Sequence, residues 1–221
     1  MREIVLIRHG QSTANAEGVW QGQLDYPLSD LGREQARYAG EALLGEEIDS
    51  FYASPLSRAF ETAQIIARAC GFSGEIIAVP GLTERGGGLF EGNTWPERER
   101  DMPEVVRRFR EAGEEAGWSI IGAETDKDIL ARFAPMIEEI LSREETGGRT
   151  VIVSHGGVMR AYLRDRFGPG VLANGQRAGN ASITRILMSE DSSVDLTSVA
   201  DSAHIPEEGR PVTPVNEPSS E

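Results

Sequence analysis

Short apolar runs alternate with longer amphipathic stretches through most of the chain. Brief runs that are bounded by polar residues are typical of buried strands. They occur at residues 4–7, 49–53, 76–79, 150–154 and 183–188, and residues 194–199 are predicted as a final edge strand. Because these runs alternate with helical patterns, we expect an α/β fold. Its predicted architecture is a three-layer sandwich, with a mostly parallel central sheet flanked by helices.

Apolar positions recur with helical spacing between the predicted strands. Helices are expected from Ser29 onward, at 56–70, at 104–115, at 124–145 and at 158–167. Pro135 lies inside the fourth of these stretches, so we expect a kink or an interruption there. Residues 14–27 are expected to form a long irregular loop, and loops of this length are usually functional or mobile.

Basic side chains follow three of the predicted strands. Arg8 and His9 come directly after the first strand, Arg58 follows the second within a few residues, and His155 follows the strand at 150–154. Ligands of such sheets bind beyond the carboxyl ends of the strands, so we expect these four side chains at one edge. Two guanidinium groups and two imidazoles can surround a phosphoryl group, and a buried cation without such a partner would be unfavourable.

The composition is that of a soluble globular protein, with 221 residues, 39 % of them hydrophobic and 26 % charged. The net charge of −14 argues against nucleic-acid binding, and it requires clustered arginines if the substrate is an anion. The apolar run at the start is too short for a signal peptide or a membrane span, so we expect a cytoplasmic protein without a membrane partner. Cys70, the only cysteine, is expected to pack in the core.

Five segments carry short motifs around these positions. The first is Arg8-His9-Gly10-Gln11-Ser12-Thr13, with Asn15 two residues further on. The others are Ser54-Pro55-Leu56-x-Arg58-Ala59-x-x-Thr62-Ala63, Leu82-x-Glu84 with the glycines that follow it, His155-Gly156-Gly157 and Asp201-x-x-His204. The set resembles the motifs of the histidine phosphatase superfamily, the phosphoglycerate-mutase-like proteins. The resemblance extends over roughly residues 3–205 and implies a phosphoglycerate-mutase-like fold.

The resemblance also implies roles for five side chains. His9 corresponds to the nucleophile that accepts the phosphoryl group. Arg8, Arg58 and His155 correspond to the groups that hold the phosphoryl oxygens. Glu84 matches the acidic residue that donates a proton to the leaving group. No metal ion or other cofactor is implied, because the arginines neutralise the phosphate.

Further residues of the motifs are expected to line the phosphate pocket. The resemblance points to Asn15, Gln21, Gly22, Gly156 and Asn180. His204, in the last motif, is expected to be structural.

One domain is expected over residues 1–205, and the segment at about 85–122 is expected to be an insertion that covers the site. Residues 206–221 are rich in Pro, Glu and Ser, so a disordered tail is predicted. Arg107 and Arg108 resemble the paired arginines with which mutases hold a substrate carboxylate. Arginines on a charged helix are also commonly just solvated, so both interpretations stay open.

Several functions compete at this stage. We expect a phosphomonoester hydrolase that acts on a small phosphorylated metabolite through a phosphohistidine. The alternatives are a cofactor-dependent phosphoglycerate mutase, a zinc-dependent hydrolase built on His9, His155 and Glu84, and a non-catalytic phosphate-binding module. The ending Asp201-x-x-His204 and the lack of a clear mutase-type insertion favour hydrolysis. The sequence specifies neither the substrate nor the oligomeric state.

Overall fold

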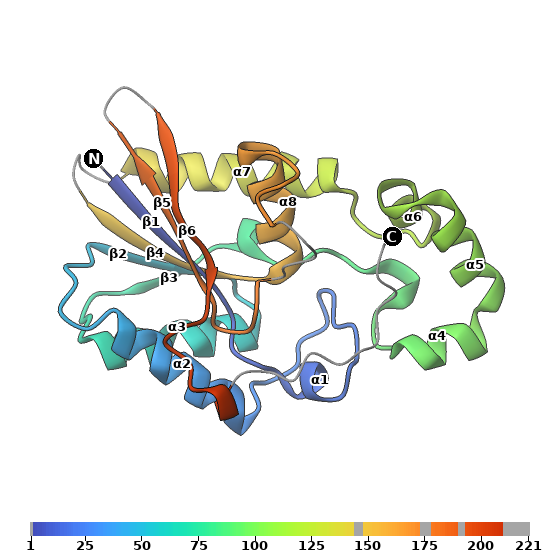
Figure 1. Cartoon of the computed structure of the whole chain (residues 1–221), viewed down its shortest axis with the longest axis horizontal. Coiled ribbons are helices and arrows are strands. Elements are labelled where there is room, and N and C mark those ends of the chain that lie inside the picture. Colours follow the sequence, from blue (N-terminus) through green and yellow to red (C-terminus); the bar gives the residue numbers. More distant parts are fainter. Residues whose placement is uncertain (1, 144–147, 173–177, 190–192, 210–221) are drawn as a thin grey trace.

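A computed structural model describes the chain except for residues 1, 144–147, 173–177, 190–192 and 210–221 (Figure 1). Its described strands form one six-stranded sheet in the order β3-β2-β4-β1-β5-β6. The strands are β1 (Arg2–Arg8), β2 (Ser50–Ala53), β3 (Ile76–Ala78), β4 (Arg149–Ser154), β5 (Ile183–Met188) and β6 (Val194–Asp201). The first four strands pair in parallel, and β5 and β6 add antiparallel strands at one edge. The predicted mostly parallel α/β sheet is therefore confirmed.

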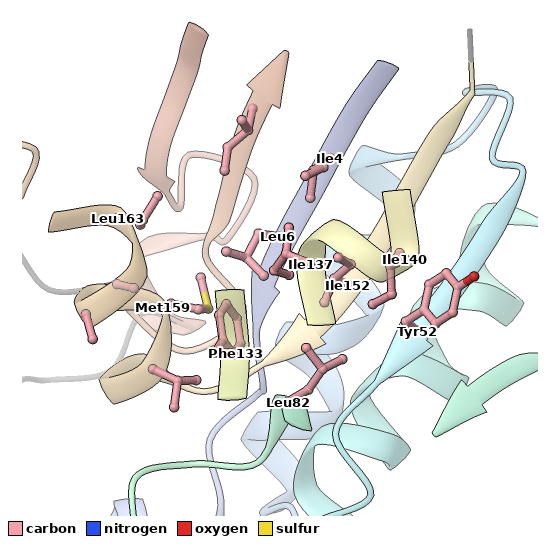
Figure 2. Close-up of a cluster of buried hydrophobic side chains, with 14 of the residues drawn as sticks. Ile4, Leu6, Tyr52, Leu82, Phe133, Ile137, Ile140, Ile152, Met159 and Leu163 are labelled. Atoms are coloured by element: carbon pink, nitrogen blue, oxygen red, sulfur yellow. The ribbon is translucent and has the colours of Figure 1, made fainter. Parts of the chain in front are cut away.

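Helices cover both faces of the sheet (Figure 1). The helices α2 (Asp30–Ala42) and α3 (Ser57–Cys70) cover one face, and α7 (Asp126–Arg143) and α8 (Gly156–Phe167) cover the other. Alternate residues of β1 point to opposite faces, so Val5 and Ile7 pack with α2 and α3. Ile4 and Leu6 join the cluster of α7 and α8, which is drawn in Figure 2. Both faces of β1 are thus buried, which explains its continuous apolar run.

Two predictions about the helices have different outcomes. Cys70 is buried at the end of α3, as expected from its place on the apolar stripe. The interruption expected at Pro135 does not occur, because α7 continues through this residue. Phe133 and Ile137 on either side are almost completely buried in the core. Their packing outweighs the one backbone hydrogen bond that proline removes.

The segment after residue 93 folds into three helices, whereas a single helix at 104–115 was predicted. They are α4 (Trp95–Asp101), α5 (Pro103–Ala112) and α6 (Glu114–Ile120). A capping box between Thr94 and Glu97 starts α4, and Pro103 occupies the first turn of α5. Gly113 separates α5 from α6 with a φ of 74°, a conformation that glycine adopts without strain.

These three helices share a small apolar core of their own. Its buried members are Phe90, Val106, Trp118, Ile121 and Ala123. Trp20 from the N-terminal loop packs against this cluster, and its ring lies 5.3 Å from the Trp118 ring. The same loop contains the short helix α1 (Thr13–Ala16), which Ser12 and Asn15 cap reciprocally. The stretch 14–27 is therefore less irregular than predicted.

The C-terminal end of the described chain is ordered further than predicted. Ile205 is fully buried against α2 and α3, and a 3-10 turn, Glu207–Gly209, follows it. The buried Gln35 amide donates a hydrogen bond of 2.8 Å to the Gly209 carbonyl. The tail boundary expected at residue 206 is therefore wrong for residues 206–209, and residues 210–221 lie outside the described part. None of the described helices combines the length and apolarity needed to cross a bilayer.

Two glycines let the loop after β1 approach helix α2. A Cβ atom on Gly32 would lie 1.9 Å from the Gln11 carbonyl oxygen, and one on Gly10 would lie 2.3 Å from the Gly32 oxygen. Both neighbours are backbone atoms, so they cannot rotate away. The backbone that follows His9 is thus held directly against the first turn of α2.

Replacing Gly32 with alanine is expected to lower the free energy of unfolding by about 1–3 kcal/mol, because the added methyl group overpacks this contact. An alanine in a helix normally stabilises it by up to about 1 kcal/mol, so the sign is diagnostic. Urea denaturation measures the change. Gly170→Ala is the control, since a Cβ atom there meets open space. A Gly32→Ala variant as stable as the wild type would show that the contact relaxes freely.

Candidate active site

The two motif histidines meet at the carboxyl edge of the sheet. His9 follows β1 and His155 follows β4, and these strands are parallel neighbours with Arg8 opposite Ser154. The ring centroids lie 5.0 Å apart, and both side chains are buried. The structure therefore brings together the two residues that the sequence places about 150 positions apart.

His9 is held as a neutral ring with one free nitrogen. Its Nδ1 lies 2.7 Å from the Gly10 carbonyl oxygen, which can only accept, so this nitrogen carries the proton. The lone pair is then on Nε2. Burial, followed by the charges of Arg58 and Arg8, lowers the pKa of His9 well below its usual value of 6.5. The ring is therefore neutral at neutral pH, and the lone pair of Nε2 is available for bond formation.

His155 is also buried and neutral, and Ser54 orients it. The Nε2 atom lies 2.8 Å from the Ser54 hydroxyl oxygen, which accepts a bond of 3.3 Å from the Leu56 amide. Burial, then the charge of Arg58, lowers the pKa of His155 well below 6.5. Its buried Nδ1 has no hydrogen-bond partner among the described residues, so this nitrogen is available to a ligand.

Arg58 lies completely buried in the first turn of α3. Its two terminal nitrogens each donate a hydrogen bond of 2.8 Å, one to the Leu24 carbonyl and one to the Gly22 carbonyl. The Nε atom is buried and has no hydrogen-bond partner among the described residues. The N-terminal loop thus fixes the guanidinium plane and leaves a donor of this cation for an anion.

Arg8 reaches the same region from the end of β1. Its Nη1 donates a hydrogen bond of 2.6 Å to the Ala178 carbonyl. A Cβ atom on Gly156 would lie 3.3 Å from Arg8 Nε, so the absence of a side chain at Gly156 leaves room for the guanidinium group. Gly156 therefore contributes space to the site, and it opens the helix that follows His155.

Glu84 is anchored at the start of α8. One carboxylate oxygen accepts from the Arg85 amide at 2.7 Å and the Val158 amide at 3.2 Å, and the other accepts from the Gly157 amide at 3.1 Å. A Cβ atom on Gly157 would lie 2.5 Å from a Glu84 oxygen, so this glycine permits the contact. The carboxylate thus sits on the helix that His155 begins.

The remaining predicted pocket residues lie around this centre in two groups. The Asn180 amide nitrogen donates to the His9 carbonyl and to the Asn15 side-chain oxygen, both at 3.2 Å, so these two residues support the backbone of His9. Gln21 is buried, and its side-chain oxygen has no hydrogen-bond partner among the described residues. Gly22, with a φ of 52°, supplies the carbonyl that holds Arg58.

The sequence motifs assign no role to three further residues near the site. They are Ser54 beside His155, Thr62, and Gln35. The Thr62 hydroxyl accepts from the Gly10 amide at 3.0 Å, and the Gln35 oxygen accepts from the Gln11 amide at 2.9 Å. Gln35 and Thr62 are polar residues on the buried faces of α2 and α3, among small or apolar residues, and Ser54 directly follows the buried strand β2. That contrast is the signal that could have identified them.

Some candidates do not join the site. Arg107 forms hydrogen-bonded ion pairs with Glu104 and Glu111 on the exposed face of α5. Arg108 is exposed on the same helix, and the His204 ring lies 3.1 Å from the Ala181 carbonyl, which fits a structural role. Within the described residues, no three His, Cys, Asp or Glu side chains gather as a metal-ligand set. The zinc interpretation therefore gains no support from the positions of these side chains.

Comparisons with known proteins agree with this geometry. The sequence model of the histidine phosphatase superfamily (branch 1) matches residues 4–201. A metal-independent phosphoserine phosphatase of Arabidopsis thaliana is 40 % identical over 164 residues, which cover 73 % of this chain and 68 % of that protein. A 2,3-bisphosphoglycerate-dependent phosphoglycerate mutase of Azorhizobium caulinodans is 34 % identical over 189 residues, which cover 82 % of this chain and 90 % of that protein.

Solved structures resemble the chain in the same way. A mycobacterial glucosyl-3-phosphoglycerate phosphatase, determined as a complex with VO3, superposes with a TM-score of 0.78. Its sequence is 31 % identical, and the superposition covers 91 % of this chain and all of that one. The likeness therefore extends over most of the fold.

Proposed function

The chain belongs to the histidine phosphatase superfamily, and we propose that it hydrolyses small phosphorylated metabolites through a phosphohistidine at His9. The observation that carries the proposal is the state of His9. The ring is buried and neutral, its Nδ1 proton is bonded to Gly10, and its Nε2 lone pair is free. Charged Arg8 and Arg58 lie close enough to lower the pKa of this ring, so they also lie close enough to attract a phosphate.

The first step is attack of His9 Nε2 on phosphorus, in line with the ester oxygen that leaves. A P–N bond forms and the P–O bond to the leaving group breaks. Arg8, Arg58 and His155 hold the three equatorial oxygens, on which the negative charge is spread. The unpartnered Arg58 Nε and His155 Nδ1 support this role, because a bound phosphoryl group would satisfy both buried atoms.

Glu84 handles the protons of both steps. In its protonated form it gives a proton to the departing alkoxide, which leaves as an alcohol. As a carboxylate it then removes a proton from water, the water oxygen bonds to phosphorus, and the P–N bond breaks. Inorganic phosphate and neutral His9 result, so the cycle closes without a redox partner or a bound metal.

We further propose that residues 85–122 form a lid over this site within a single domain. The support is the separate apolar core of α4 to α6, which Trp20 joins to the loop that holds Arg58. Substrate selection then depends on the lid, while the sheet supplies the chemistry. The relatives named for phosphoserine and glucosyl-3-phosphoglycerate support a substrate among the alkyl phosphates of small polar metabolites.

A phosphoglycerate mutase is the second candidate, because a mutase is among the similar proteins. The position of Arg107 argues for hydrolysis instead, since Glu104 and Glu111 neutralise this cation on the lid surface. A mutase also needs a cation for the carboxylate of its substrate. Hydrolysis needs only the phosphate contacts.

A panel of phosphomonoesters tests the proposal. We expect phosphate release from phosphoserine, sugar phosphates or phosphoglycerate derivatives, measured at several pH values and with a strong chelator present. Conversion of 3- to 2-phosphoglycerate is measured in parallel, with bisphosphoglycerate added. Phosphate release without isomerisation supports the phosphatase, faster isomerisation supports the mutase, and complete loss of activity in the chelator contradicts the metal-independent mechanism.

A further inference from the structure

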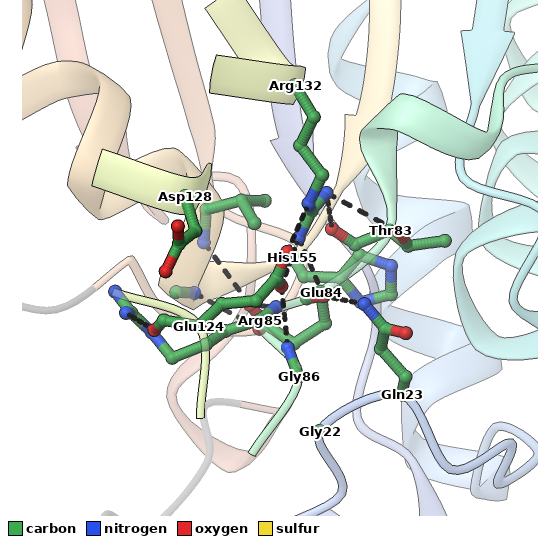
Figure 3. A network of polar contacts seen from close by, with 12 residues as sticks. Gly22, Gln23, Thr83, Glu84, Arg85, Gly86, Glu124, Asp128, Arg132 and His155 are labelled. Atoms are coloured by element: carbon green, nitrogen blue, oxygen red, sulfur yellow. Dashed lines mark hydrogen bonds and ion pairs between the residues drawn. The ribbon is translucent and has the colours of Figure 1, made fainter. Parts of the chain in front are cut away.

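Arg132 on helix α7 donates hydrogen bonds to the backbone that carries Glu84 (Figure 3). Its Nη1 donates to the carbonyl oxygens of Gly81 at 3.0 Å and Thr83 at 2.8 Å. Its Nη2 donates to the carbonyl oxygen of Glu84 itself at 2.9 Å. One guanidinium group therefore binds three carbonyls within four residues of the loop.

Glu124 binds the backbone on the other side of Glu84. Its carboxylate accepts from Arg132 Nε and Nη2, both at 2.8 Å, and from the Gly86 amide at 2.7 Å (Figure 3). Burial works against ionisation of Glu124, but the hydrogen bonds from Arg132 and Gly86 keep its pKa below the usual value. The pair Arg132–Glu124 thus holds the backbone before, at and after Glu84.

The loop needs such external contacts, because it has little stiffness of its own. Gly86, Gly87 and Gly88 follow directly after Arg85, and glycine loses the most backbone freedom when it is ordered. The Glu84 side chain is fixed at its carboxyl end by the α8 amides. Its backbone end is fixed by Arg132 and by the Gln23 amide, which donates to the Glu84 carbonyl at 3.0 Å.

We propose that Arg132, braced by Glu124, is the positioning residue of the proton donor Glu84. It sets the distance between the Glu84 carboxyl group and the oxygen of the leaving group, and it does not touch the substrate. The inference rests on the proposed function, in which Glu84 protonates the departing alkoxide. A displacement of about 1 Å at such a group is enough to reduce the rate about 10²-fold.

The choice of leaving group separates positioning from mere structural support. An alkoxide leaves slowly unless a general acid protonates it, whereas p-nitrophenolate leaves readily without a proton. A misplaced Glu84 therefore impairs alkyl phosphates selectively. A general loss of stability or of folded protein lowers the rates for both substrates by the same factor.

The test compares Arg132→Met with the wild type, using p-nitrophenyl phosphate and the alkyl phosphate that the wild type hydrolyses fastest. We expect kcat/KM to fall about 10²-fold for the alkyl phosphate and less than about tenfold for p-nitrophenyl phosphate. An equal fall of kcat/KM for the two substrates would overturn the proposal. If Arg132→Met does not fold, the same comparison with Arg132→Lys decides, because lysine keeps the charge but lacks the fork that binds several carbonyls.

Arg185→Met is the matched control. The Arg185 side chain is 23 % exposed, as is that of Arg132, and it binds two carboxylates, those of Glu3 and Glu46. Its partners lie toward the opposite end of β1 from His9. We expect Arg185→Met to lower the thermal midpoint while the ratio of the two kcat/KM values stays that of the wild type. A changed ratio in this control would overturn the interpretation of the Arg132 result.

Glu84→Gln distinguishes failure of the inference from failure of the proposed function. If Glu84→Gln leaves the ratio unchanged, the proposed role of Glu84 is wrong and the inference falls with it. If Glu84→Gln lowers the ratio but Arg132→Met does not, only the inference is wrong. In the double variant we expect no further change of the ratio beyond that of Glu84→Gln, because the two residues act in one step.

Discussion

Replacing His9 with alanine is expected to reduce kcat/KM for phosphomonoesters by at least about 10⁴-fold, the scale on which loss of a covalent nucleophile acts. The reason is that no other described side chain near the phosphoryl position combines a free lone pair with neutrality. His155 is also neutral, but in its proposed role the unpartnered Nδ1 donates to a phosphoryl oxygen and so carries the proton, while the Nε2 lone pair faces the Ser54 hydroxyl group. The phosphate contacts of Arg8 and Arg58 survive in this variant, so binding of inorganic phosphate is expected to persist.

The measurement is a rapid quench with labelled substrate, followed by a search for an acid-labile, base-stable phosphoenzyme. The label is expected in the wild type and absent from His9→Ala. His155→Ala is the comparison, because it removes a buried imidazole of the same size but leaves the nucleophile. Normal turnover by His9→Ala, or equal labelling of both variants, would contradict a phosphohistidine at position 9.

Replacing Arg58 with alanine is expected to lower kcat/KM by about 10²- to 10³-fold. This is the range for the loss of one preorganised donor to a developing negative charge, and Nε is the donor atom of Arg58 that has no partner among the described residues. The loop at Gly22 and Leu24 also loses its hydrogen-bond donors in this variant. Steady-state kinetics with p-nitrophenyl phosphate measures the change, and circular dichroism checks the fold.

The Arg58→Ala variant is also expected to shift the acid limb of the pH profile. Burial and then the Arg58 charge lower the pKa of His9, so loss of the cation raises this pKa. A larger fraction of His9 is then protonated at acid pH, and the acid limb of kcat/KM moves toward neutral pH. Arg58→Lys keeps a positive charge, so we expect reduced activity with a smaller shift. An unchanged acid limb in Arg58→Ala would contradict the electrostatic coupling.

The parallel sheet could be predicted because its strands are short, buried on both faces and separated by helical patterns. The convergence of His9, Arg58 and His155 follows from the same reasoning, since parallel strands present their carboxyl ends at one edge. The order of the strands could not be predicted from local pattern. The adjacency of β1 and β4, which sets the 5.0 Å between the histidine rings, depends on long-range pairing.

The segment of α4 to α6, which we propose as a lid, was predicted less well, because its helices carry few apolar residues and bury them against distant partners. Phe90 and Trp20 complete the cluster of Trp118 from outside the three helices. Local signals at Thr94 and Gly113 mark the helix boundaries, but a largely charged stretch hides them.

Arg132 illustrates a different limit of the sequence. It stands beside Phe133 in a stretch whose apolar spacing predicts only a helix. Its importance comes from carbonyl groups 48–51 positions earlier in the chain. Every residue has a backbone carbonyl group, so the residue types do not reveal such a partner. The ordered turn at Glu207–Gly209 was missed for a related reason, since its anchor is the Gln35 amide in another element.

The separate apolar core of α4 to α6 has a consequence for how this protein can diversify. Its members contribute to neither of the two clusters that hold the sheet between its helical layers. Substitutions at Val106 or Trp118 are therefore expected to alter the proposed lid, while the two clusters that align His9 and His155 keep their packing. Substitutions in this one segment can therefore change the substrate preference, while the residues proposed to transfer the phosphoryl group stay the same.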